Sequence, residues 1–359
     1  MTDAMRFHWR LPQRGEGDAG TTRTEQYASV DVGVPDLEEQ VAFAREAEAC
    51  GIDSLLVDYS WIKPDSIVLS TALGLNTTSV KYIIAYRSGI MSPTAFVQQL
   101  NTLSTLIGGR LSVNVVAGYS PEEQRRYGDF LSHDERYART EEFLAVCNGL
   151  WSGGEVDFAG RHYRVEKGAL RTPFLAPDRS APELYVAGNS AQARALAMAQ
   201  GTCWMMMAEA PEKIRTNAAE VLAAGKTVGA RMGIIVRNTR ADAMDAAHAM
   251  VAEAEANRVT ERSFVQKSDA VCLNRTFEEA ENEWLAPHLW TGAVRAFGST
   301  AIALVGSPED IADGLLSFRQ AGVTQFILSG WPKLETMRAF ARDVLPIVRE
   351  RETAACASF

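Results

Sequence analysis

The sequence of 359 residues lacks the patterns that mark several common kinds of site. Its five cysteines are scattered and form no C-x-x-C pair, which indicates reduced thiols rather than a disulfide framework. The histidines are far apart and no H-E-x-x-H motif occurs, so the sequence predicts no metal site. Neither a Ser-His-Asp triad nor a glycosidase-like pair of carboxylates can be recognised. A chain without such a side-chain set is expected to use a cofactor.

Charge and hydropathy exclude further classes of partner. The net charge is −9 and no cluster of basic residues stands out, which argues against nucleic acid. No run reaches the roughly 18 apolar residues of a membrane helix. The first ten residues, MTDAMRFHWR, contain acid and base before any apolar run, unlike a signal peptide. We therefore expect a soluble, cytoplasmic protein that binds neither nucleic acid nor membrane.

Short β-rich runs alternate with helical patterns along the chain. The predicted strands cover 7–12, 52–58, 80–86, 110–118, 182–188, 202–208, 230–238 and 323–330. The predicted helices cover 35–51, 64–76, 92–109, 211–225, 308–322 and 334–350, with further helices starting at Pro121, Asp134 and Ser190. Two segments interrupt the alternation: a hairpin over 156–165 and a long polar and helical stretch over 240–300.

Eight strand–helix units predict an α/β fold, a (β/α)₈ TIM barrel with insertions near 150–180 and 240–300. The alternative is a doubly wound open sheet, which is less favoured because no G-x-G-x-x-G follows the first strand. No linker rich in proline, glycine or serine is present. The sequence therefore predicts one domain over 1–350, followed by a C-terminal tail over 351–359.

In a TIM barrel the active site lies at the C-terminal ends of the strands. The residues expected there are Arg14 and the segments 58–63, 86–87, 114–119, 188–190, 207–209, 231–233 and 330–333.

Gly188, Asn189 and Ser190 end a strand and open a helix, where backbone N–H groups can bind a phosphate. A helix N-cap at Ser190 or Asn189 is an alternative that is compatible with this site.

Other polar residues near these strand ends allow two interpretations each. Lys63, Arg87 and Arg231 are expected to converge and to bind an anion, unless each pairs with an acid such as Asp58 or Glu209. Asn114 interrupts an apolar strand and Tyr137 lies in a helix that follows it. Each of these two either serves the site or makes a structural hydrogen bond.

Several motifs together resemble a known superfamily over about residues 1–350. They include WRLPQRGEG (9–17), SPTAFVQQLNTLSTLIGGRLSVNVVAG (92–118), FLSHDERYARTEEF (130–143), LYVAGNS (184–190), ALVGSPEDIA (303–312) and FILSGWPKLE (326–335). The sequence resembles the bacterial luciferase-like flavin monooxygenases, and among them the FMNH₂-dependent alkanesulfonate monooxygenases.

This resemblance implies a cofactor, partners and site residues. It implies reduced FMN from a separate NAD(P)H:flavin reductase, O₂ activation through a C4a-(hydro)peroxyflavin, a mobile lid within 240–300, and an assembly of two or four copies. By the family pattern, Asn114, Gly118 and Tyr137 contact the flavin or its phosphate, which the backbone of Gly188, Asn189 and Ser190 holds. Among the catalytic positions, Arg231 matches a substrate-binding arginine and Arg295 a lid arginine.

Three positions depart from the alkanesulfonate pattern. Lys63 stands where the family has a cysteine, Gly233 where it has a histidine, and Trp331 where it has a tyrosine. Lys63 is thus a candidate acid–base group, a candidate charge that attracts an anion, or a surface residue of a mobile loop. Because the flavin-side residues match and the substrate-side residues differ, simple alkanesulfonates are not the expected substrate.

The resulting hypothesis is a two-component FMNH₂ monooxygenase that acts on a small, anionic organic substrate, such as an organosulfur compound. C–S cleavage, hydroxylation and N-oxygenation all remain open as its reaction. An F420-dependent oxidoreductase on the same barrel and a non-catalytic flavin-binding protein are the alternatives.

Overall fold

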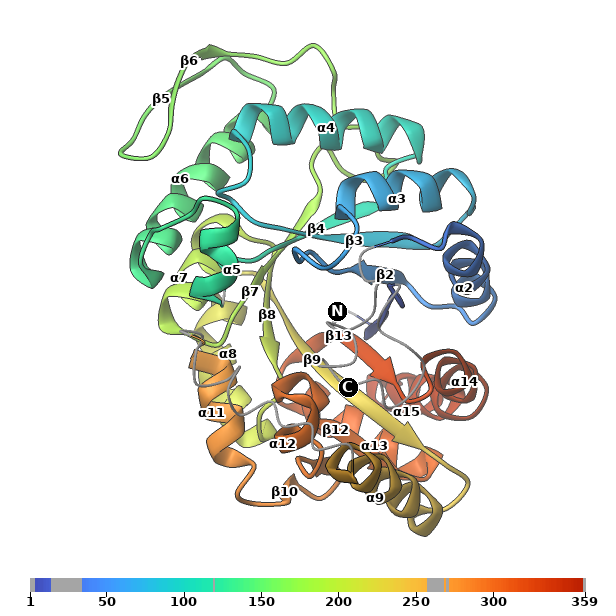
Figure 1. The fold of residues 1–359 in the computed structure, drawn as a ribbon. Coiled ribbons are helices and arrows are strands. Elements are labelled where there is room, and N and C mark those ends of the chain that lie inside the picture. The colour runs from blue at the N-terminus through green and yellow to red at the C-terminus, as the bar shows by residue number, and fades with distance from the viewer. Residues whose placement is uncertain (1–3, 14–33, 119, 257–267, 269–270, 358–359) are drawn as a thin grey trace.

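The computed structural model describes residues 4–13, 34–118, 120–256, 268 and 271–357. Parallel strands form a closed barrel, in which β13 pairs with β1 and β8 pairs with β9 (Figure 1). The barrel strands are β1 (Arg6–Arg10), β2 (Ser54–Val57), β3 (Lys81–Tyr86), β4 (Leu111–Val115), β7 (Glu183–Ala187), β8 (Cys203–Met207), β9 (Thr227–Val236) and β13 (Val323–Gly330). The (β/α)₈ barrel predicted from the sequence is confirmed, and closure excludes the open sheet.

Helices surround the barrel, and several of them begin at a serine or aspartate cap. The side chains of Asp36, Asp65, Ser92, Ser120 and Ser132 accept hydrogen bonds from the first turns of the helices that follow them. The helices up to β9 are α2 (Leu37–Ala49), α3 (Ser66–Leu75), α4 (Pro93–Leu106), α5 (Pro121–Arg126), α6 (His133–Trp151), α7 (Ala191–Gln200) and α8 (Pro211–Ala223). None of the described helices is long and apolar enough to cross a membrane.

The C-terminal helices run further than expected. After α13 (Pro308–Gln320), the predicted helix 334–350 consists of α14 (Lys333–Ala339), a π-helical turn η2 (Phe340–Val344) and α15 (Leu345–Ala357). Helix α15 therefore continues into residues 351–357, which the sequence predicts to belong to a C-terminal tail.

The first insertion is the predicted hairpin, formed by β5 (Val156–Ala159) and β6 (Arg164–Gly168). It lies at the periphery near α6 (Figure 1). The Glu142 carboxylate of α6 accepts hydrogen bonds from the backbone N–H groups of Arg161, His162 and Tyr163. These hydrogen bonds hold the hairpin against the helix.

The second insertion follows β9. It contains α9 (Arg240–Ala256), α11 (Val271–Glu279), β10 (Trp284–Ala286), β11 (Leu289–Trp290), α12 (Val294–Phe297), the 3₁₀ turn η1 (Ser299–Ala301) and β12 (Ala303–Gly306). The sequence analysis missed β12, which has only four residues. This strand forms because β9 is ten residues long: β8 pairs with its first half, and β12 pairs from Gly233 onward.

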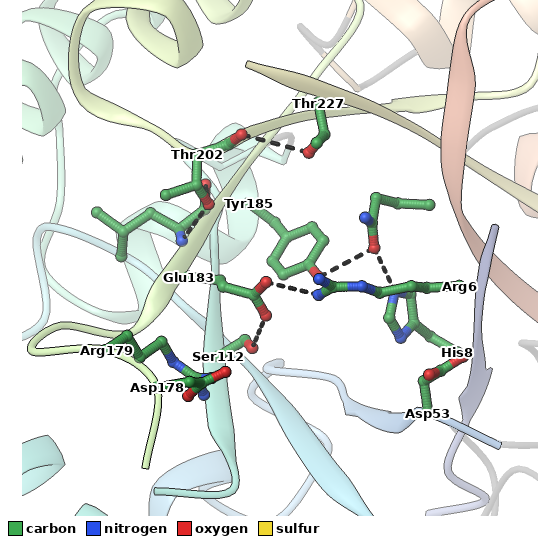
Figure 2. Close-up of polar contacts among 12 residues, drawn as sticks. Arg6, His8, Asp53, Ser112, Asp178, Arg179, Glu183, Tyr185, Thr202 and Thr227 are labelled. Atoms are coloured by element: carbon green, nitrogen blue, oxygen red, sulfur yellow. Dashed lines mark hydrogen bonds and ion pairs between the residues drawn. The ribbon is translucent and has the colours of Figure 1, made fainter. Parts of the chain in front are cut away.

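The barrel interior is apolar in its middle and polar at its N-terminal end. Tyr185, Cys203, Met205 and Ile327 fill the middle together with residues of β2 and β3. At the N-terminal end, His8 Nε2 donates to Gln325 Oε1 at 3.0 Å, and the Tyr185 hydroxyl donates to the same oxygen at 3.3 Å (Figure 2).

His8 is an uncharged residue of this polar end. Only 1% of it is exposed, and its Nδ1 atom has no hydrogen-bond partner. Burial lowers the pKa of the imidazole, and the Gln325 hydrogen bond and the charges of Asp53 and Glu183 oppose this shift only in part. The folded protein therefore holds the neutral form at a pH where the unfolded chain already takes up a proton.

We predict that His8 makes the fold sensitive to mild acid. The unfolded state binds more protons once the pH falls below about 6.5, so the free energy of unfolding should decrease there by at most about 1.4 kcal/mol per pH unit. Urea unfolding at pH 7.5, 6.5 and 5.5 measures this slope. In His8→Gln the slope should be shallower, and equal slopes in both proteins would contradict the assignment.

Candidate functional site

Three cationic side chains meet one carboxylate at the C-terminal end of the barrel. Asp58, which follows β2, contacts Arg10 at 2.6 Å, Lys63 at 3.0 Å and Arg231 at 3.7 Å. Arg231 comes from β9, Arg10 ends β1, and Lys63 lies in the loop after β2. The structure therefore brings together Lys63 and Arg231 as expected, and Asp58 is the acid that they share.

The Asp58 carboxylate stays ionised in this setting. Burial would raise its pKa, but the charges of Lys63, Arg10 and Arg231 and a hydrogen bond from Arg10 hold the pKa well below its usual range. The Lys63 side chain is only 9% exposed. The interpretation of Lys63 as a surface residue of a mobile loop is therefore wrong, because its ammonium group is enclosed beside Asp58.

Arg87 makes a separate buried ion pair. Its Nη2 atom lies 2.7 Å from Glu123 Oε2, and both side chains are almost fully buried. The guanidinium also lies 5.7 Å from the ring centre of Tyr59 and 5.9 Å from that of Tyr127. Arg87 thus pairs with an acid, as the alternative interpretation predicted, and that acid is Glu123 on α5, which the sequence did not single out.

The turn over 188–190 combines a helix cap with hydrogen bonds to the neighbouring strand β8. Ser190 caps α7, since its Oγ accepts the N–H of Ala193 at 3.1 Å, as the alternative interpretation predicted. The Asn189 carboxamide bonds to the N–H and C=O of Met207 and to Glu209. Both side chains are thus used within the protein. The Gly188 N–H also donates to the Met205 carbonyl at 2.9 Å, and the Gly188 carbonyl accepts from Trp204 Nε1 at 2.7 Å. The groups of this turn that can hold a ligand are therefore the backbone N–H groups of Asn189 and Ser190.

Gly188 leaves room beside Tyr137. It has a φ of +140°, and a Cβ atom built on it would lie 2.9 Å from the Tyr137 hydroxyl and 2.9 Å from Ala193 Cβ. Tyr137, from α6, therefore reaches the end of β7, and a side chain at position 188 would fill the space between them.

Asn114 and Gly118 lie on β4 and in the loop after it. The Asn114 side chain is only 6% exposed, yet its Oδ1 accepts no hydrogen bond. Gly118 has a φ of +101°, and the buried Arg136 guanidinium donates to its carbonyl and to that of Ala117. A buried acceptor without a donor is costly, so Asn114 is suited to receive an N–H from a ligand.

Trp331 occupies the space beside Gly233. A Cβ atom on Gly233 would lie 2.7 and 2.9 Å from two carbons of the benzo ring of Trp331. Gly233 and Arg231 are two residues apart on β9 and therefore face the same side of the strand. The indole thus forms an apolar wall next to Arg231, and it fits there because position 233 carries no side chain.

The remaining predicted positions are less informative. Arg295 is exposed on α12, and its guanidinium lies 5.6 Å from the ring centre of Phe277 on α11, within the second insertion. Arg14 and Tyr119 lie outside the described residues. Sequence reasoning named Asp58 and Glu209 only as possible ion-pair partners and missed Arg10, because strand-end patterns give no sign of which charges meet.

Comparison with known proteins identifies the family. The model of the luciferase-like monooxygenase family matches residues 5–325. The chain belongs to this family. The resemblance to the luciferase-like monooxygenases is thereby confirmed, as is the expectation of a flavin-dependent monooxygenase. The finer resemblance to the alkanesulfonate enzymes stays a prediction.

Several solved structures share the fold. EDTA monooxygenase from Chelativorans sp. BNC1 has a TM-score of 0.75 and 20% identity, covering 97% of this chain and 94% of that one. A riboflavin lyase solved with modified FMN has a TM-score of 0.75 and 19% identity, with coverages of 98% and 92%. An F420-dependent secondary alcohol dehydrogenase has a TM-score of 0.67 and 19% identity, with coverages of 96% and 99%.

The described residues fit a flavin phosphate. Asn114 offers a buried acceptor, and the 188–190 turn offers backbone groups at a position where a Cβ would obstruct the approach. This fit rests on the buried Asn114 oxygen that accepts no hydrogen bond and on the space that Gly188 leaves beside Tyr137.

We predict that Gly233 and Trp331 cannot be changed independently. Gly233→Ala should destabilise the protein by about 1–3 kcal/mol, because the new methyl group overlaps the indole. In a Trp331→Phe background, whose smaller single ring lacks the outer carbons of the indole, the same substitution should cost much less. Urea unfolding of the double-mutant cycle measures the coupling.

Gly154→Ala serves as the matched control, since a Cβ there meets nothing within 4 Å. Additive effects of Gly233→Ala and Trp331→Phe would show that the two residues do not share one space.

Proposed function

We propose that this protein is the oxygenase of a two-component system. It binds FMN that a separate NAD(P)H:flavin reductase has reduced, and it uses O₂ to oxidise a small organic substrate that carries a negative charge. The observation that carries this proposal is the family match over residues 5–325. The cytoplasmic location and the assembly of two or four copies stay predictions.

The cofactor part of the proposal rests on β4 and β7. Backbone N–H groups of Asn189 and Ser190 would hold the phosphate, with Gly188 leaving room for it beside the Tyr137 hydroxyl. The Asn114 carboxamide oxygen would accept an N–H group of the flavin ring. When bound, the reduced flavin supplies the electrons that activate O₂.

The substrate part rests on the cations around Asp58. Arg10, Lys63 and Arg231 converge at the barrel mouth, and a guanidinium recognises a sulfonate or carboxylate through paired hydrogen bonds. Lys63, held 3.0 Å from Asp58, fits the role of a charge that attracts the substrate. Trp331 would exclude water on one side of Arg231 and has no group able to act as a base.

Oxygen uptake distinguishes the proposal from its alternatives. With a flavin reductase, NAD(P)H and FMN, the protein should consume O₂ beyond the reductase background when an organosulfonate, sulfone or amine of the right shape is added. Mass spectrometry with ¹⁸O₂ should find one labelled oxygen in the product.

Other outcomes would favour other functions. Substrate-dependent reduction of F420 without O₂ consumption would indicate the oxidoreductase alternative. Tight flavin binding without turnover over a broad panel of charged and neutral substrates would indicate the non-catalytic one.

We predict that Arg231 contributes to substrate binding and not to cofactor binding. Arg231→Met should lower kcat/KM for an anionic substrate at least about tenfold, because a charge-assisted hydrogen bond contributes about 1.5–3 kcal/mol. The affinity for FMN should be unchanged. Lys63→Met should raise KM with little change in kcat, and steady-state kinetics on both variants test this.

A neutral substrate of the same shape is the control, since its kcat/KM should change little in either variant. If Arg231→Met instead weakens FMN binding, or if its unfolding midpoint collapses, Arg231 belongs to the cofactor site or to the fold.

A further inference from the structure

The turn at the end of β7 is connected to a helix of the second insertion through one carboxylate. Glu209 follows β8 and is only 3% exposed. Its Oε1 atom accepts from Asn189 Nδ2 at 2.7 Å and from Arg275 Nη1 at 3.2 Å. Asn189 belongs to the 188–190 turn and Arg275 to α11, so the same oxygen joins two parts of the chain that are distant in sequence.

Hydrogen bonds hold the Asn189 carboxamide in one orientation toward Glu209. Its Oδ1 accepts the N–H of Met207 at 2.9 Å, and its Nδ2 donates to the Met207 carbonyl at 3.1 Å as well as to Glu209. All of its donors are therefore used. A shift of the turn must move the carboxamide and, with it, the hydrogen bond to Glu209.

Arg275 extends the connection along α11. Its Nε atom lies 3.3 Å from Glu279 Oε1, one turn further along the helix, and Glu279 also pairs with Lys213 of α8. Figure 1 shows α11 beside α8. The ion pairs thus run from Glu209 through Arg275 and Glu279 to Lys213. The Lys213–Glu279 pair lies at the far end of this series and does not contact Glu209, so a variant of Lys213 serves as a control for one of Arg275.

We propose that Glu209 is a positioning residue that couples phosphate binding at the 188–190 turn to the docking of α11 on the barrel. This inference rests on the proposed FMN site. A buried carboxylate needs a cationic partner, so Glu209 keeps Arg275 and α11 in place as long as Asn189 holds its own position. By reciprocity, a phosphate that fixes the turn stabilises the docked helix, and the docked helix strengthens phosphate binding by the same factor.

The test compares Arg275→Met with Lys213→Met, because each variant removes one cation from the series but only the first leaves Glu209 without its ion pair. Oxidised FMN and riboflavin are the probes, and they differ only in the phosphate. Quenching of flavin fluorescence gives both affinities, and hydrogen exchange follows the peptide containing residues 271–279 with and without each flavin.

We expect Arg275→Met to weaken FMN binding about tenfold, which is within the usual range of coupling, and to leave riboflavin binding unchanged. FMN should slow exchange in α11 of the wild type and of Lys213→Met, but not of Arg275→Met. Riboflavin should have no such effect in any of the three proteins.

Glu209→Gln provides a second variant if Arg275→Met folds poorly. Its carboxamide can still accept from Asn189 but cannot form an ion pair, so FMN should again lose affinity more than riboflavin.

Three results would overturn the inference. The first is an equal loss of affinity for FMN and for riboflavin in Arg275→Met, and the second is an equal change of FMN affinity in Arg275→Met and Lys213→Met. The third is a hydrogen-exchange rate in α11 of the wild type that does not change when FMN binds. A wild-type protein that binds neither flavin would overturn the proposed function as well. One that binds FMN and consumes O₂ without any response in α11 would overturn the coupling alone.

Discussion

Strand β9 is paired along both edges, and the rest of the structure depends on this pairing. Its first half closes the barrel against β8, its other edge runs along β13, and its second half continues past the rim to receive β12. A closed parallel barrel buries one face of its strands in the interior and the other under helices, which explains the apolar strands. Because Arg231 and Gly233 lie on this strand, barrel closure also fixes the part of the mouth where Arg231 meets Asp58.

The mouth places its charges in distinct environments. Asp58 contacts three largely buried cations, Arg87 and Glu123 pair beside aromatic rings, and Glu209 joins a turn to a helix. The unpaired acceptor of Asn114 lies deeper in the barrel. Under the proposed function, the cofactor is held by backbone and amide groups from one half of the barrel, while charged side chains select the substrate in the other half.

Much of this arrangement could be predicted from the sequence because it depends on local patterns. The barrel strands follow from runs of apolar residues, and the helix starts follow from serine and aspartate at the right spacing. Strand ends also indicated which residues reach the mouth, including Lys63 and Arg231. Partner choice could not be predicted, since Glu123 pairs with Arg87 across 36 residues and Arg275 with Glu209 across 66. The strand β12 was missed because the length of β9, not its own sequence, creates it.

The contact between Trp331 and Gly233 also restricts how this barrel can change over generations. Because the indole fills the place of a side chain at position 233, a larger residue there costs less once the tryptophan has been replaced. Volume therefore favours one order of substitutions. A lineage that replaces this apolar wall with a polar side chain on β9 would pass most readily through a form with an open space next to Arg231, and under the proposed function that form would admit bulkier substrates than either neighbour.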